Sequence, residues 1–245
     1  MTRALLTLTA RQLLGRRRSL FIVLLALIPV LVAAVYRLAG GQTDPLPIEF
    51  AAGILDTLVI AAVLPLTALV FGTSALGAEI EDGTAVYLLT KPVARWRIVL
   101  VKIAVAAGAT IALILPPAVL ASVIVLGGDE AALTPALAGA VAVGAVVYCA
   151  LFVALSVRTS RALLIGLAYV LIWEGIVPSI FDVTRWISVR QYMLGTADLI
   201  SGAPRDVLAA DLGGGPALIA AACLTVLTAF AATRLLQRFE IGQRL

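Results

Sequence analysis

Six long apolar runs that carry almost no charge limit the folds open to this chain more than any other feature. The runs cover residues 20–39, 50–76, 98–126, 134–157, 162–180 and 216–233. Each is close to or above the roughly 20 apolar residues that a helix needs to cross a hydrocarbon core about 30 Å thick. Hydrophobic residues make up 62% of the chain and charged residues 13%, whereas soluble domains carry about 25% charged residues. We therefore predict an all-α polytopic membrane protein with six transmembrane helices, built as one transmembrane domain over residues 1–245.

Several kinds of catalytic and binding site are excluded by what the sequence lacks. The chain contains no histidine, which excludes histidine-based metal sites, catalytic triads and proton relays. It has no G-x-x-x-x-G-K-[ST] phosphate loop and no G-x-S-x-G or H-E-x-x-H motif. Cys149 and Cys223 lie inside apolar runs, as small hydrophobic residues do, so we expect no disulfide. We therefore expect no enzyme activity in this chain, and any energy that drives it must come from elsewhere.

The basic residues fall mainly on one side of the predicted membrane. Of the 18 Lys and Arg residues, 14 lie before the first run, between the second and third or at the start of the third (Lys102), between the fourth and fifth, or after the sixth. Because cytoplasmic loops carry an excess of Lys and Arg, both termini and residues 77–97 are predicted to be cytoplasmic. The net charge of +4 follows from this bias and from attraction to anionic membrane lipid, so we expect no nucleic-acid partner.

Two segments outside the runs have the periodicity of amphipathic helices. Residues 1–18 alternate leucines with arginines, which fits a basic interfacial helix on the inner membrane surface. The run that follows is too long for a signal peptide and is read as a retained span. Residues 182–201 place one set of apolar residues at helical spacing: Trp186, Val189, Met193, Ala197 and Ile200. The polar residues of this segment, Thr184, Ser188, Gln191 and Asp198, fall on the opposite side. We predict an amphipathic helix that lies on the outer face or dips inward.

A dense polar stretch, GAEIEDGTAVYLLTKPVARWR, separates the second and third runs at residues 77–97. Asp82 or Thr84 can cap a short helix, and Pro92 ends it. Acids precede this helix and basic residues follow it, and exposed apolar residues are expected at Tyr87, Leu88 and Leu89. Two interpretations are open: a capped hairpin flanked by cytoplasmic charges, or a docking surface, since exposed apolar residues ringed by charge mark partner sites.

The segment EIEDGTAVYLLTKPVAR resembles the E-x-E-x-G-T-x-x-x-L-L-x-x-P-x-x-R signature of ABC-2 type transport permeases. As in that family, a lysine, Lys102, opens the third span, although Ile80 stands where the family often has Arg. A second stretch, YVLIWEGIVPSIFDVTRWISVRQYML, is similar to the fifth-span region of the subgroup related to the copper-maturation permease NosY.

The resemblance implies that residues 79–92 form a coupling helix seated in a groove of a separately encoded ATP-binding subunit. The residues that it assigns to this contact are Glu79, Glu81, Asp82, Gly83, Thr84, Tyr87, Leu88, Leu89, Pro92 and Arg95. ATP and Mg would then be bound by the partner subunit, and this chain would hold no cofactor. A second permease copy, identical or a close paralogue, would complete the working unit, with the substrate path between the two.

Two acids, Asp56 and Glu174, lie inside the runs, where carboxylates are costly and face a cavity or a partner. We expect Glu174 to pair with a base of the outer segment, such as Arg185 or Arg190, and so to pin that segment, which also carries Trp186. Substrate contact and proton handling are the alternatives. The sequence as a whole indicates the permease subunit of an ATP-binding-cassette exporter for a lipophilic or amphiphilic substrate, in a bacterial plasma membrane. The alternative is a stand-alone ion- or proton-coupled transporter, or a membrane enzyme, working through these two acids.

Overall fold

The structure, a computed structural model, describes residues 18–40, 47–81, 94–126, 133–177, 186–201 and 210–237. Helices make up almost all of these residues, and the described ranges contain no β-strand. The all-α prediction is therefore confirmed for them. The predicted interfacial helix over residues 1–18 lies outside the described residues except for Arg18, where the first described helix begins.

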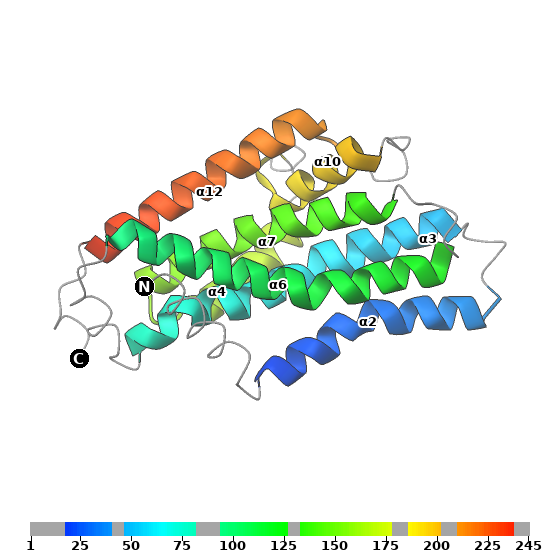
Figure 1. The fold of residues 1–245 in the computed structure, drawn as a ribbon, viewed down its shortest axis with the longest axis horizontal. Helices are drawn as coiled ribbons and strands as arrows, with labels where there is room; N and C mark the ends of the chain where they lie inside the picture. The colour runs from blue at the N-terminus through cyan, green and yellow to red at the C-terminus, as the bar shows by residue number, and fades with distance from the viewer. Residues whose placement is uncertain are drawn as a thin grey trace.

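The helices run in long antiparallel passes along the molecule (Figure 1). In chain order they are α2 (Arg18–Leu38), α3 (Pro47–Gly53), the π-helical segment η1 (Ile54–Val63), α4 (Leu64–Glu81), α6 (Arg95–Leu126), α7 (Leu133–Arg158), α8 (Ala162–Ala168), the π-helical segment η2 (Tyr169–Glu174), α10 (Val189–Ser201) and α12 (Gly214–Gln237). The segments α3, η1 and α4 form one continuous helical pass, as do α8 and η2.

Helix α7 lies at the centre of the bundle. It packs against α4, α6, α10 and α12, and Figure 1 shows it between α6 and α12. Its sequence is apolar on every side, which is typical of a helix buried all round. The largest of its fully buried side chains are Tyr148 and Phe152. The other helices are therefore positioned by their contacts with α7.

Small residues allow the helices around α7 to approach closely. A Cβ atom built on Gly72 of α4 would lie 2.8 Å from Cβ of Phe152 in α7, and one on Gly195 of α10 would lie 2.7 Å from Cβ of Ala217 in α12. No real Cβ atom tolerates such distances, so glycine is required at both positions. Apolar burial gives little driving force between helices in lipid, so close packing at small residues supplies much of it instead.

The two ends of the bundle carry different charges. The end where α4 stops and α6 begins, which we name the basic end, carries six of the described basic residues, Arg95, Arg97, Lys102, Arg158, Arg161 and Arg234, together with the acids Glu79 and Glu81. The opposite end, which we name the acidic end, carries the acids Glu49, Asp56, Glu174, Asp198 and Asp211, together with Arg37 and Arg190. This separation follows the alternation of charge that the sequence predicts for the loops.

Four helical passes of the described chain are long and apolar enough to cross a membrane: Pro47–Ile80, Arg95–Leu126, Thr134–Arg158 and Gly214–Gln237. The prediction of six such spans is not confirmed. The first and fifth apolar runs form shorter apolar helices, Ile22–Leu38 and Ala162–Glu174. The fifth differs from the predicted span over residues 162–180 because it changes to a π-helical turn at Tyr169 and ends in a turn after Glu174.

The prediction of an amphipathic surface helix over residues 182–201 is wrong in part. The helix that the structure describes within residues 182–201 is α10. It packs between α7 and α12 and is buried around most of its circumference. Ser188 and Gln191, expected on the polar side, are buried, whereas Trp186 and Ile200, expected on the apolar side, are 61% and 42% exposed. A helix held between two neighbours buries polar residues as well, provided that they find hydrogen-bond partners. Packing between α7 and α12 is the arrangement that the structure shows for α10.

Candidate functional site

Most of the predicted coupling segment lies outside the described residues. This applies to seven of its ten predicted positions: Asp82, Gly83, Thr84, Tyr87, Leu88, Leu89 and Pro92. The structure places the two ends of the segment at the basic end, with Glu79 and Glu81 closing α4 and Arg95 opening α6. The segment is therefore carried between the ends of two long helices that pack against each other.

A buried ion pair joins these two helices directly below the segment. Nζ of Lys102 in α6 lies 2.6 Å from Oε1 of Glu79 in α4, and the two side chains are 2% and 16% exposed. Breaking such a pair leaves an uncompensated buried charge, which is strongly destabilising. The last turn of α4 and the first turns of α6 are therefore held at a fixed separation. The resemblance singled out both residues but gave no indication that they pair.

Arg95 and Arg97 extend this basic end beyond the ion pair. The side chain of Arg95 is half-buried, and its Nη1 has no hydrogen-bond partner among the described residues. The guanidinium of Arg97 lies 5.2 Å from the ring centroid of the exposed Trp96, a cation–π contact. A tryptophan beside arginines is typical of a membrane–water interface.

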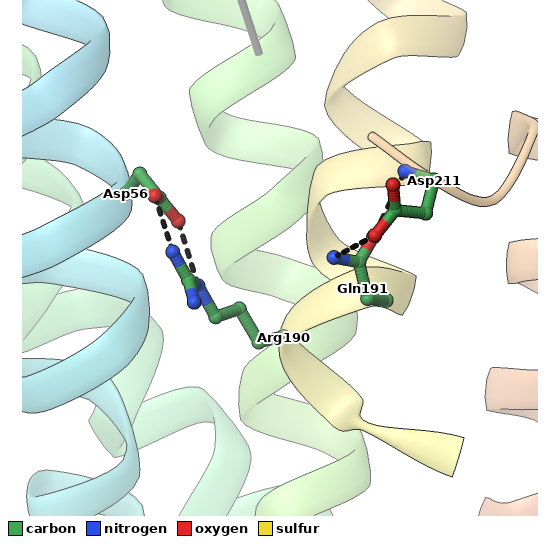
Figure 2. A network of polar contacts seen from close by, with 4 residues as sticks. All are labelled: Asp56, Arg190, Gln191 and Asp211. Atoms are coloured by element: carbon green, nitrogen blue, oxygen red, sulfur yellow. Dashed lines mark hydrogen bonds and ion pairs between the residues drawn. The ribbon is translucent and has the colours of Figure 1, made fainter. Parts of the chain in front are cut away.

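At the acidic end, Asp56 and Arg190 form a two-fold ion pair (Figure 2). Nε of Arg190 donates to Oδ1 of Asp56 at 2.8 Å, and Nη2 donates to Oδ2 at 2.5 Å. Hydrogen bonding to Asp56 raises the pKa of Arg190 above its ordinary value, although partial burial lowers it. The pair connects η1 to the first turn of α10 across 134 residues of sequence.

Glu174 is held by the same helix, but through different groups. Its carboxylate is buried and accepts hydrogen bonds from Oγ of Ser188 at 2.5 Å, from the backbone N–H of Val189 at 3.0 Å and from the hydroxyl of Tyr169 at 3.1 Å. A carboxylate at a helix N-terminus satisfies free N–H groups and interacts favourably with the helix dipole. Glu174 therefore caps α10.

The expected ion pair between Glu174 and Arg190 is not what the structure shows. The guanidinium of Arg190 is taken by Asp56, and only the backbone N–H of Arg190 approaches Glu174, at 3.5 Å. Arg185, the other candidate, lies outside the described residues. A helix N-terminus offers several donors at once, so it satisfies a buried carboxylate without a second charge.

A third contact ties α10 to the residues that precede α12. Nε2 of Gln191 donates to Oδ2 of Asp211 at 3.2 Å, and the backbone N–H of Asp211 donates to Oε1 of Gln191 at 3.1 Å (Figure 2). Sequence reasoning missed Tyr169, Ser188, Gln191 and Asp211 as members of these contacts. Only Asp211 stood out, as part of a glycine-rich stretch that reads as a loop.

These contacts make a structural clamp on α10 rather than a reaction centre. Both intramembrane carboxylates are occupied by donors of the protein, and the side chain of Trp186 is exposed. Nowhere in the described ranges do three or more Cys, Asp or Glu residues gather as they would around a metal ion. The arrangement can fix the position of α10, and it offers no free nucleophile or metal-ligand set.

Comparison with known proteins identifies the family. A model of the ABC-2 family transporter proteins matches residues 14–184, more than two-thirds of the chain. The match spans Glu79, Lys102, Asp56 and Glu174. No curated protein matches the chain. Membrane subunits of that family carry no cofactor and work with an ATPase subunit. Since most of the chain fits the family, and since four apolar passes of the described chain can cross a membrane, this protein belongs to the ABC-2 transporter family as a multi-pass membrane protein.

Proposed function

We propose that this chain is the permease of an ABC exporter and that residues 79–95 pass the motion of the ATPase subunit to the membrane helices. The observation that carries the proposal is the buried ion pair between Glu79 and Lys102, which ties the ends of α4 and α6 together where the segment is attached. A movement of this segment, driven by the ATPase subunit, would then displace α4 and α6 together.

Two further features support a docking role at the basic end. Nη1 of Arg95 is a buried donor with no hydrogen-bond partner in the described part of the chain, and a carboxylate of a partner could satisfy it. The segment itself combines acids, Glu81 and Asp82, with the apolar Leu88 and Leu89. Charge at an interface sets partner choice and register, while buried apolar side chains supply most of the affinity.

The stand-alone alternative has less support. A carboxylate that carries ions or protons must be reachable by them, but Glu174 is buried under three close donors and Asp56 is occupied by Arg190. The family also works with an ATPase subunit, and the chain has no phosphate loop of its own.

We extend the proposal to features that the sequence predicts. The substrate is a lipophilic or amphiphilic molecule, because the apolar passes offer mostly aliphatic side chains. The working unit contains a second permease, identical or a close paralogue, in a bacterial plasma membrane with both termini cytoplasmic. The NosY-like subgroup is the one that residues 169–194 resemble.

The proposal is tested by co-purification of the ATPase subunit. Leu88→Asp should lower the amount of ATPase subunit recovered with the tagged permease roughly tenfold or more, because it would bury an unpaired charge in the interface. Glu81→Lys combined with Asp82→Lys should leave the complex intact but reduce the ATP hydrolysis that the assembled complex shows.

The matched control is Gln237→Asp, which adds the same charge to an exposed position at the end of α12, at the same end of the bundle. It should leave recovery and hydrolysis unchanged. Full recovery of the ATPase subunit with Leu88→Asp, together with normal hydrolysis in the double variant, would show that the segment is only a turn between two helices.

A further inference from the structure

A cavity of about 270 Å³ opens at the basic end, between the last turns of α4 and the turn that joins α7 to α8. At about 30 Å³ for each water molecule, this space is large enough for a small polar group rather than a single water. Its described lining comes from α4, α7, α8 and the turn at residues 159–161, and no carboxylate is among these described residues. Neither the proposed coupling segment nor the clamp on α10 uses these residues.

The mouth of the cavity offers hydrogen-bond donors and a positive charge. Arg161 is exposed and forms no ion pair with any described residue. Oγ1 of Thr159 accepts the backbone N–H of Arg161 at 3.2 Å, which leaves its own hydroxyl hydrogen free to donate. Ser160 is exposed beside them. A guanidinium together with hydroxyl donors is a typical site for a phosphate group.

The inner wall offers acceptors instead. The hydroxyl of Thr73 donates to the backbone oxygen of Leu69 at 2.6 Å, and that of Ser156 donates to the backbone oxygen of Val153 at 2.8 Å. Both hydroxyl hydrogens are therefore used, so the buried Thr73 and Ser156 present lone pairs to the cavity. The group that fills this part must bring donors of its own, such as hydroxyl groups.

An apolar surface continues from the mouth. Leu163 and Leu164 line the cavity and are 40% and 64% exposed. In a membrane protein such leucines face hydrocarbon. An occupant that suits all three surfaces has a negatively charged group, a hydroxyl-bearing group and an apolar chain.

We propose that this cavity binds the headgroup of an anionic glycerophospholipid, with Arg161 holding the phosphate, Thr73 and Ser156 accepting from the glycerol hydroxyls, and an acyl chain lying along Leu164. Basic pockets between transmembrane helices are known as a mode of lipid headgroup recognition. The bound lipid would join α4 to α8 at the end of the bundle where the ATPase subunit is proposed to dock. The site does not depend on that docking.

The test is lipid titration of the purified full-length chain in detergent, followed by native mass spectrometry. Phosphatidylglycerol should bind more tightly than phosphatidylcholine, which lacks both the net negative charge and the hydroxyls. Arg161→Gln should weaken phosphatidylglycerol binding roughly tenfold, as expected for the loss of a charge-assisted hydrogen bond. The control Arg234→Gln removes a basic residue at the same end, on α12, and should leave binding unchanged.

A second variant changes a residue on the α4 wall of the cavity. Ser74→Leu would fill the cavity from α4, and it should abolish the same binding. If size-exclusion chromatography shows that this variant does not fold, Arg161→Gln still decides the result. Competition by glycerol phosphate at the same concentration as the lipid would show that the site takes a free phosphate ester and would overturn the lipid assignment. Equal binding by Arg161→Gln and wild type would overturn the site itself.

Discussion

Asp56 and Glu174, the two carboxylates within the apolar runs, are both held by the first turn of α10. Asp56 accepts hydrogen bonds from the guanidinium of Arg190, and Glu174 accepts them from the hydroxyl of Ser188 and the backbone N–H of Val189. An unpaired carboxylate in such surroundings would cost several kcal/mol or become protonated. A buried carboxylate with its partners adds little net stability compared with apolar residues in the same place. The main effect of Asp56 and Glu174 is therefore to fix the position of α10.

We expect Glu174→Gln to destabilise the protein by about 1–3 kcal/mol, because the amide group turns a donor toward at least one of the N–H and O–H groups that now donate to the carboxylate. Thermal unfolding of the purified protein in detergent measures this. The matched control is Glu49→Gln at the exposed start of α3, which should have little effect. Association with the ATPase subunit should be retained by both variants. A wild-type melting temperature and activity for Glu174→Leu would mean that the cap on α10 has no such role.

At the scale of elements, the basic end is built from two helices that share a buried charge pair. Lys102 is almost fully buried in α6, and Glu79 lies in the last turns of α4. Moving the two helix ends apart would leave a buried charge without its partner, and this limits how far they can separate. The ends of α4 and α6 are therefore suited to move as a unit.

We expect Lys102→Met to destabilise the protein by up to about 3 kcal/mol, since it leaves the Glu79 carboxylate without its cation. Lys102→Arg keeps the charge and should cost much less. Neutralising both partners, with Glu79→Gln added to Lys102→Met, should recover part of the loss. The measurements are thermal unfolding and recovery of the ATPase subunit for the three variants. If the double variant is no more stable than Lys102→Met, the unpaired charge is not the cause.

Helix α10 has the periodicity of a surface helix but is packed inside the bundle. Its apolar periodicity is genuine, but α7 and α12 cover it from two sides, so polar positions such as Gln191 are buried as well. The close approach of Met193 to Gly144 of α7, and of Ala217 in α12 to Gly195, leaves no room for a side chain at either glycine. The contacts with Asp56, Glu174 and Asp211 then fix its position along the bundle.

At the scale of the whole molecule, the charge separation between the two ends predicts the orientation in the membrane. Fourteen of the 18 basic residues belong to the side predicted to be cytoplasmic. The structure places the described members of that set at one end of the bundle, with α10 at the other (Figure 1).

We expect a cysteine at position 187, introduced as Ile187→Cys, to react with a membrane-impermeant thiol reagent in intact cells, whereas one introduced as Ser160→Cys should react only after permeabilisation. Ile187 is exposed, while its neighbour Ser188 is buried against Glu174 and is unsuitable. Cys149 is buried and Cys223 is exposed, so both variants are made with Cys223→Ala. Labelling in the reverse order would overturn the predicted topology.

The sequence by itself determined the properties that depend on local composition. Apolar runs near 20 residues identify membrane helices without reference to any neighbour, and the Lys and Arg count separates the two ends because each loop contributes independently. The motif from Glu79 to Arg95 indicated the ABC-2 family, and the match over residues 14–184 confirms the family. The number of spans did not follow from composition alone, because a change from α-helical to π-helical geometry, as at Tyr169–Glu174, leaves no mark in the apolar composition of a run.

Only the tertiary structure decided which groups pair. From sequence, Arg190 was a reasonable partner for Glu174, which lies 16 residues away, but it pairs with Asp56, 134 residues away, and leaves its backbone N–H for Glu174. A buried carboxylate accepts from whichever donors the packing brings within reach, charged or neutral. Those donors are set by how α7 and α12 enclose α10, and a contact between distant segments leaves no local pattern in the sequence.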